Sequence, residues 1–83
     1  MTVAPQEIDG IVAEVMSQVL GLPVAPAGNM AMGDCEAWDS LKHIELIVTL
    51  EERFEITFEG DRLPELTSQA LFAEYVRQSL RHA

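Results

Sequence analysis

Apolar residues recur along the amino-terminal part of the chain with the period of a helix. Residues 5–20 place them on one helical face, which predicts a helix with that face in the core. The face consists of Ile8, Ile11, Val12, Val15, Met16 and Val19. Pro5 suits the first turn of a helix. Gly21 and Pro23 suit its end, so we expect the helix to close near Leu20.

The second helical segment begins at Ser40 and is apolar around most of its circumference. Such a wide apolar surface favours a central position in the fold. The polar arc consists of Lys42, Glu45, Thr49, Glu52 and Arg53, and the apolar surface of Ile44, Leu46, Ile47, Leu50 and Phe54. Leu41 and Val48 fall on the border beside acidic residues, so we expect both to be half exposed. This border suits a recognition stripe, and an ordinary boundary between core and solvent is the alternative.

The remaining residues predict one short helix and one long helix. Residues 55–66 contain a glycine and a proline and leave room only for a short helix. Residues 56–58 alternate like a strand, but no second run could pair with them, so we reject a sheet. Thr67 or Ser68 is expected to cap the last helix. The inward face of that helix is predicted to hold Leu71, Phe72, Tyr75, Val76 and Leu80.

Between the first two helices lies a segment without a regular period. Residues 22–37 are rich in proline and glycine and predict a long loop, from which Met30 and Met32 reach the core. Loops of this length in compact domains are usually functional or mobile. The whole pattern predicts an all-α fold, a four-helix bundle with three long helices and one short helix. We expect a single domain over residues 1–83, with an ordered core of about 5–81.

The charge of the chain narrows the choice of partners. With 14 acidic and 5 basic residues among 83, the net charge is −9. Nucleic acid is not an expected partner, because its phosphates would repel this surface. A basic patch on a partner protein is the natural complement, and acidity that only keeps a small domain soluble is the alternative. We expect a monomer that is too small for a large catalytic cleft.

Cysteine usage and hydropathy bear on the compartment. Cys35 is the only cysteine, which excludes an intramolecular disulfide and a cysteine-based zinc cluster and fits a reducing environment. Residues 1–10 lack the basic and apolar regions of a signal peptide. No apolar run approaches the roughly 20 residues that span a bilayer. The sequence therefore predicts a cytoplasmic protein without membrane insertion.

Neither a metal site nor a catalytic site is expected. His43 and His82 form no helical ligand pair. Asp34 and Glu36 lack a regular pattern of oxygen ligands. Hydrolysis by Ser40 would require a base and an oxyanion hole, and no Gly-x-Ser-x-Gly turn surrounds it. We therefore predict no catalytic residues and interpret His43 as a surface or boundary side chain.

The segment around Ser40 carries the strongest motif in the chain. Asp39-Ser40-Leu41 stands where a helix N-cap is expected. An apolar-Glu-Leu step follows, and then Leu-Glu-Glu-x-Phe. Over residues 39–54 this pattern resembles the acyl carrier protein family, and residues 66–67 resemble the entry into the family's last helix. The resemblance covers roughly the second half of the chain, and the first half agrees in plan only.

The resemblance implies an acyl-carrier type of bundle in which Ser40 carries a covalent 4′-phosphopantetheine arm derived from coenzyme A. A separate magnesium-dependent phosphopantetheinyl transferase would attach the arm. An acyl- or aminoacyl-loading ligase would charge it as a thioester, downstream synthase or transferase enzymes would use the cargo, and the carrier would catalyse nothing. The positions that dock partner enzymes in the family are matched here by Asp39, Leu41, Glu45, Val48, Glu51 and Glu52.

Three residues near the motif depart from the pattern of fatty-acid carriers, namely Trp38, Lys42 and His43. The segment Trp38-Asp39-Ser40-Leu41 is more similar to stand-alone, peptidyl or polyketide carriers, which favours a carrier of specialised biosynthesis. The alternatives are an acyl carrier of primary fatty-acid or lipid synthesis and an unmodified acidic helical interaction module, in which Ser40 would merely cap its helix. Trp38 is interpreted either as a hydrophobic staple onto His43 across an Asp39 cap or as ordinary cover of the core.

Overall fold

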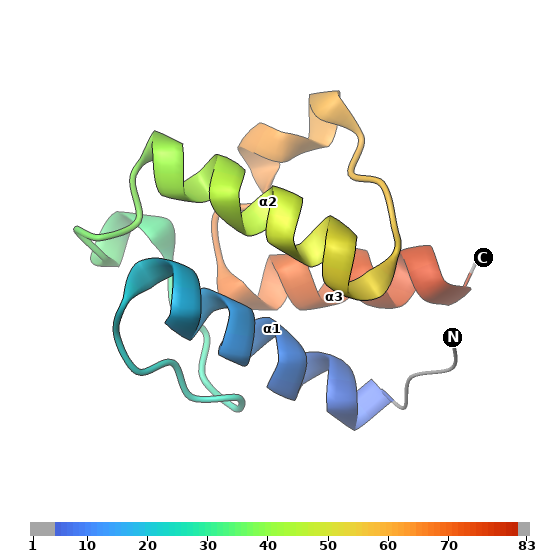
Figure 1. Ribbon diagram of the computed structural model, residues 1–83, viewed down its shortest axis with the longest axis horizontal. Coiled ribbons are helices and arrows are strands. Elements are labelled where there is room, and N and C mark those ends of the chain that lie inside the picture. Colours follow the sequence, from blue (N-terminus) through green and yellow to red (C-terminus); the bar gives the residue numbers. More distant parts are fainter. Residues whose placement is uncertain (1–4, 82–83) are drawn as a thin grey trace.

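Three α-helices and two short 3-10 helices make up the computed structural model, which describes residues 5–81 (Figure 1). The α-helices are α1 (Pro5–Leu20), α2 (Ser40–Phe54) and α3 (Gln69–Arg81), and the 3-10 helices are η1 (Met32–Asp34) and η2 (Gly60–Glu65). The predicted all-α fold with three long helices and a short one is confirmed. The structure adds η1, a single turn inside the long loop.

Helix α1 ends where the sequence predicts, because Gly21 adopts a left-handed conformation. Its φ of 73° lies in the region that glycine enters at little cost. The Gly21 N–H donates to the carbonyl oxygen of Ser17 at 2.9 Å, which closes the last turn. The chain can then turn away from α1 into the long loop.

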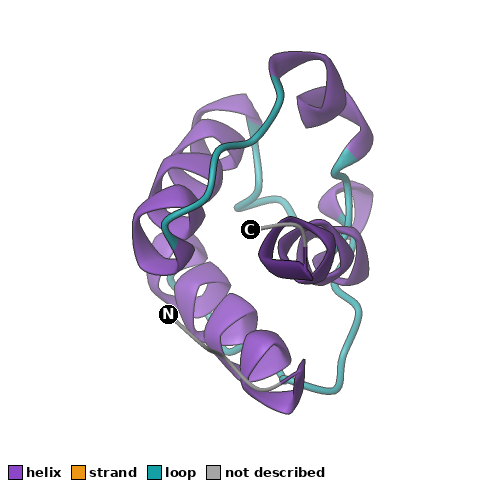
Figure 2. Cartoon of the chain, turned by 90° about the vertical axis from the view of Figure 1, so that its right-hand side faces the viewer, coloured by secondary structure: helices purple, strands orange, loops and turns teal. Residues whose placement is uncertain are grey.

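Helix α1 is the common packing partner of the other two helices. It lies against both α2 and α3, and the view in Figure 2 shows α1 and α2 forming one wall with α3 opposite. The largest fully buried side chains are Phe72, Met16, Leu46, Leu50, Val12, Val15 and Val76. All three helices therefore supply the core, and burial of their apolar faces is the main source of stability.

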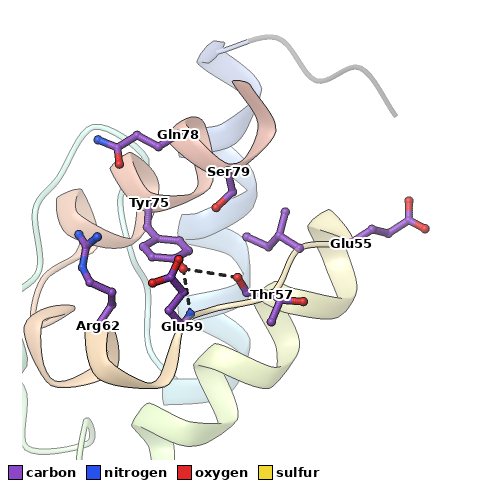
Figure 3. Close-up of a pocket in the computed structure, with 8 residues that line it drawn as sticks. Glu55, Thr57, Glu59, Arg62, Tyr75, Gln78 and Ser79 are labelled. Carbon is purple, nitrogen blue, oxygen red and sulfur yellow. Dashed lines mark hydrogen bonds between the residues drawn. The ribbon is translucent and has the colours of Figure 1, made fainter. Parts of the chain in front are cut away.

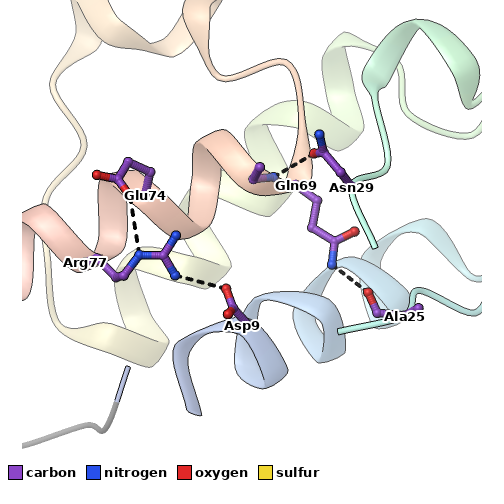
Figure 4. Close-up of polar contacts among 7 residues, drawn as sticks. Asp9, Ala25, Asn29, Gln69, Glu74 and Arg77 are labelled. Atoms are coloured by element: carbon purple, nitrogen blue, oxygen red, sulfur yellow. Dashed lines mark hydrogen bonds and ion pairs between the residues drawn. The ribbon is translucent and has the colours of Figure 1, made fainter. Parts of the chain in front are cut away.

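The long loop is tied to the first turn of α3 by polar contacts, some of which Figure 4 shows. The Gln69 N–H donates to the Met30 carbonyl oxygen at 2.8 Å, and the Ala70 N–H donates to Asn29 Oδ1 at 2.9 Å. The buried Gln69 side chain donates from Nε2 to the Ala25 carbonyl oxygen at 2.7 Å and accepts from the Met30 N–H at 3.1 Å. These bonds satisfy backbone groups that a loop beside a core would otherwise leave unpaired.

Several smaller expectations are also confirmed. Met30 and Met32 are half-buried and pack against the core. Ser68 caps α3, since its Oγ accepts from the Leu71 N–H at 3.3 Å. Residues 56–58 form no strand, and within residues 5–81 the β-pairing consists of an isolated antiparallel bridge between Ala31 and Ser68.

Two residues that were predicted to face the core lie at the surface. Ile44 is 58% exposed because η2 is too short to cover the whole apolar circumference of α2. Leu71 is 43% exposed. With about 100° per residue, Leu71 stands roughly 140° around α3 from the buried Val76. The inward positions near the start of α3 are taken instead by Gln69 and Ala73, which the apolar pattern does not indicate.

Candidate functional site

The site begins with the cap of α2, and of the two adjacent residues that the sequence places at the cap position, Asp39 is the one that caps. Asp39 has an extended backbone, and its Oδ1 accepts from the Lys42 N–H at 2.9 Å. Its carbonyl oxygen accepts from the His43 N–H at 2.9 Å, which starts the helical ladder. Since Asp39 does the capping, Ser40 is the first helical residue and its exposed hydroxyl is not used as the cap.

Ser40 stands at the edge of a largely apolar cleft of about 350 Å³. The cleft lies between the first half of α2 on one side and η2 with the following residues on the other. Its lining consists of Met32, Ser40, His43, Ile44, Ile47, Leu63, Pro64 and Thr67. Apart from His43, no lining side chain is ionisable. The arrangement places an exposed hydroxyl next to apolar walls.

Trp38 and His43 are in contact, as the staple interpretation predicts. Trp38 Nε1–H donates to His43 Nδ1 at 3.1 Å, and the ring centroids lie 6.0 Å apart. Trp38 is also only 2% exposed and stacks on Phe72 of α3 with centroids 5.8 Å apart. Both interpretations of Trp38 therefore hold together: the indole covers core and also fixes the entry of the chain into α2.

His43 is half-buried, which confirms its interpretation as a boundary residue. Its Nε2 lies 2.9 Å from the carbonyl oxygen of Leu63 in η2, while Nδ1 accepts from Trp38. Neither ring nitrogen is left to take a proton from Ser40. In this arrangement His43 does not serve as the general base of a serine–histidine type of hydrolysis.

Three apolar side chains project from α2 into solvent and form what we call the α2 ridge: Leu41, Ile44 and Val48. Their exposed fractions are 65%, 58% and 47%, so the expectation that Leu41 and Val48 are exposed at least in part is confirmed. Ile44 is the member of the ridge that the helical wheel placed in the core. A scattered exposed apolar residue is ordinary, but three at helical spacing form a contiguous surface.

Acidic residues flank the α2 ridge. Glu45 and Glu52 are exposed, and Glu45 lies 3.5 Å from Lys42 Nζ in a surface ion pair. Such a pair contributes little to stability. Glu51 is placed differently from these two: it is half-buried, and its Oε2 accepts from the Phe58 N–H at 2.8 Å. This carboxylate fastens the chain after α2, and its role in partner binding stays a prediction.

Three arginines form four ion pairs with acidic residues far from the start of α2. The ion pairs are Arg53 with Glu14, Arg62 with Glu65, and Arg77 with both Asp9 and Glu74; Figure 4 shows the Arg77 pairs. Partial burial opposes the charge of Arg77, but hydrogen bonds to Asp9 and Glu74 raise its pKa overall. Hydrogen bonds from Gln78 and Arg77 lower the pKa of Glu74. Much of the basic charge is therefore paired with acidic residues at a distance from Ser40.

A second pocket, of about 380 Å³, lies at the opposite end of α2 (Figure 3). Tyr75 dominates it: its Oη accepts from the Glu59 N–H at 2.9 Å and donates to the Thr57 carbonyl oxygen at 3.4 Å. The Arg62 guanidinium carbon stands 5.6 Å from the centre of the same ring. These contacts hold the chain between α2 and η2, and none of the predicted site residues lines the pocket.

Among residues 5–81, no three His, Cys, Asp or Glu side chains gather in a way that could hold a metal ion. Cys35 is a free, half-buried thiol, and His82 lies outside the described residues. None of the helices in that part of the chain combines the length and the apolar character that crossing a membrane requires.

Comparison with known proteins gives no family for this chain. No family model matches the sequence, and no curated protein matches it. Function therefore has to be inferred from the geometry at the start of α2: an exposed hydroxyl beside a capping carboxylate, an adjacent apolar cleft, and an apolar ridge flanked by acidic residues.

Proposed function

We propose that the protein is a carrier of the acyl-carrier type, in which Ser40 receives 4′-phosphopantetheine from coenzyme A and shuttles a thioester-bound acyl or aminoacyl group between enzymes. The observation that carries this proposal is that the cap and the exposed hydroxyl at the start of α2 belong to different residues. Asp39 caps the helix, so the Ser40 hydroxyl is exposed and available to a transferase. The resemblance over residues 39–54 supports the same conclusion.

The position of Ser40 suits the product of the modification. A phosphodiester on its Oγ would lie at the amino end of α2, where backbone N–H groups and the helix dipole favour an anion. At an exposed site this interaction contributes about 0.3–1 kcal/mol. The helix end tolerates the added charge. In the transferase-catalysed step the Ser40 hydroxyl loses its proton, Oγ bonds to the phosphorus that bears pantetheine, the pyrophosphate bond of coenzyme A breaks, and adenosine 3′,5′-bisphosphate leaves. The cleft beside Ser40 offers the attached arm an apolar wall.

The α2 ridge and its acidic flanks suit transient docking of partner enzymes. Apolar contacts from Leu41, Ile44 and Val48 would supply affinity, while Glu45 and Glu52 would steer a basic partner surface. The proposed partners are a phosphopantetheinyl transferase, an acyl- or aminoacyl-loading ligase, and downstream synthase or transferase enzymes. Each has to bind and leave in turn, so modest affinity with electrostatic steering fits the task. We place this exchange in the cytoplasm.

For the cargo we propose specialised biosynthesis of the polyketide, nonribosomal peptide or related kind, because Trp38, Lys42 and His43 differ from the pattern of fatty-acid carriers. A carrier of primary fatty-acid or lipid synthesis is the alternative with the same chemistry. A second candidate function is an interaction module without an arm. The exposed α2 ridge favours it, since a docking surface of this kind needs no modification to bind a partner.

Arm attachment separates the carrier from the module. Purified protein is incubated with coenzyme A, magnesium and a broad-specificity phosphopantetheinyl transferase, and its intact mass is measured. The wild type is expected to gain one phosphopantetheine and Ser40→Ala none. Ser68→Ala, which changes the cap of α3, is the control and is expected to gain one as the wild type does. A wild type that several transferases leave unmodified would favour the interaction module.

A further inference from the structure

The two contacts of His43 indicate which ring nitrogen donates and which accepts. An indole nitrogen always carries hydrogen, so Trp38 Nε1 must donate and His43 Nδ1 must accept across their 3.1 Å separation. A carbonyl oxygen only accepts, so His43 Nε2 must carry the proton that it shares with the Leu63 oxygen at 2.9 Å. The two contacts therefore fit the tautomer in which Nε2 donates and Nδ1 accepts.

This chain of hydrogen bonds connects three parts of the fold. Trp38 precedes α2 and is anchored in the core against Phe72 of α3. His43 belongs to the first turns of α2, and Leu63 belongs to η2. None of the residues of η2 is buried, although Leu63 is half-buried against the core. Packing alone therefore gives η2 little support, and the hydrogen bond from His43 matters for its placement.

The opposite end of η2 is fastened independently. The Glu59 N–H, just before η2, donates to Tyr75 Oη at 2.9 Å. The Leu63 oxygen that accepts from His43 also accepts from the Leu66 N–H at 3.2 Å. The backbone amides on the two sides of η2 thus report on different contacts. The Glu59 amide reports on the bond to Tyr75, and the Leu66 amide reports on the bond from His43 to Leu63.

We propose that His43 is a positioning residue that fastens η2 to the start of α2 and so sets the width of the cleft beside Ser40. One wall of the cleft comes from α2 and includes Ile47, and the other comes from η2 and includes Pro64. His43 and Leu63 line the cleft and bridge its walls. The fastening is a property of the bare fold, and its consequence for the arm rests on the proposed function.

The tautomer is measured on the wild type. In a long-range ¹H–¹⁵N spectrum of unmodified protein, His43 is expected to show a protonated Nε2 and a bare Nδ1. The indole N–H of Trp38, the only tryptophan in the chain, is expected to be hydrogen-bonded. A proton on Nδ1 at neutral pH, or a Trp38 N–H that exchanges as freely as an exposed indole, would overturn the proposal.

Amide exchange tests the fastening with matched variants. His43→Leu removes both bonds, whereas His43→Gln keeps an acceptor for Trp38 and a donor for Leu63. Exchange at Leu66 is expected to be about five- to tenfold faster in His43→Leu, the effect of one lost hydrogen bond, and near the wild-type rate in His43→Gln. Tyr75→Phe is the control, with faster exchange at Glu59 and an unchanged rate at Leu66. Equal exchange at Leu66 in all four proteins contradicts the proposal.

The consequence for the arm has its own readout. Attachment of phosphopantetheine is expected to shift the Thr67 amide signal in the wild type and in His43→Gln, and to shift it far less in His43→Leu. Equal shifts in the three proteins would contradict the control of cleft width by His43. The tautomer and the exchange rates are measured on unmodified protein. If mass spectrometry shows that Ser40 does not accept the arm, the proposed carrier function fails, but the test of the His43 fastening still stands.

Discussion

At the scale of single residues, the start of α2 divides two tasks between neighbouring side chains. Asp39 satisfies the Lys42 N–H through its carboxylate, and Ser40 keeps its hydroxyl exposed. A serine at the cap position itself would use the hydroxyl for the helix. Placing the reactive group one residue later therefore separates the stability of α2 from the chemistry that we propose for it.

Removing the Asp39 carboxylate is expected to destabilise the protein without touching Ser40. Asp39→Ala should lower the free energy of unfolding by about 0.5–2 kcal/mol, because an N–H in the first turn loses its partner. Asp39→Asn keeps an accepting oxygen and should lose much less. Urea unfolding of the three proteins measures the difference. An Asp39→Ala variant as stable as the wild type would mean that the cap contributes nothing.

At the scale of elements, the sequence predicts a helix boundary where a single residue type, such as a terminal glycine or a capping side chain, determines it. Gly21 ends α1, Asp39 caps α2 and Ser68 caps α3. Residue type indicated Gly21 directly and narrowed each cap to two adjacent residues, Asp39 or Ser40 and Thr67 or Ser68. The side that each helix buries was predicted less well. Ile44 is apolar and lies on an apolar helix, but its exposure depends on how far η2 reaches over α2, which no local pattern specifies.

The exposure of Ile44 can be tested against its buried neighbour Ile47, which is 6% exposed. Ile47→Ala should lower the free energy of unfolding by about 2–4 kcal/mol, through lost burial and a cavity. Ile44→Ala should change the free energy of unfolding by less than about 0.5 kcal/mol relative to the wild type. Urea unfolding compares the two variants. Similar losses at both positions would place Ile44 in the core, as the helical wheel predicted.

The end of α2 contains the strained residue of the described backbone. Glu55 has a φ of 55° and a ψ of 48°, a left-handed conformation that is costly for a side chain other than glycine. Glu55 is exposed. Replacement by glycine should therefore raise the free energy of unfolding, by up to about 1 kcal/mol. Thermal or urea unfolding of Glu55→Gly, with Glu55→Ala as the strained control, checks this. A loss of stability in Glu55→Gly would contradict it.

At the scale of the whole molecule, charge is the property that the sequence predicts most directly. The net charge of −9 follows from composition, but the distribution does not. Arg53 and Arg77 pair with acidic residues of α1. Beside the α2 ridge, Glu45 pairs with Lys42 at the surface and Glu52 is exposed. The polar network around Gln69 and the His43–Leu63 bond likewise connect residues 20 or more positions apart. Contacts of this range depend on packing and leave no local signal.

Charge reversal beside the ridge should slow arm attachment. Glu45→Lys with Glu52→Lys changes the net charge from −9 to −5, since each replacement adds two. A transferase with a basic docking surface should then act more slowly, and added salt should slow the wild type towards the mutant rate. Glu7→Lys with Glu59→Lys makes the same change elsewhere on exposed positions. Equal rates for the two double mutants at low salt would show that the acidic flanks do not steer the partner.

The most direct test of the carrier role is the covalent state of Ser40 in protein isolated from cells that produce it. Cleavage after glutamate releases residues 37–45, in which Ser40 is the only serine. Tandem mass spectrometry of this peptide is expected to find phosphopantetheine, free or acylated, on Ser40. A peptide that is unmodified throughout, in cells that modify a co-expressed carrier of known activity, would contradict the proposed function.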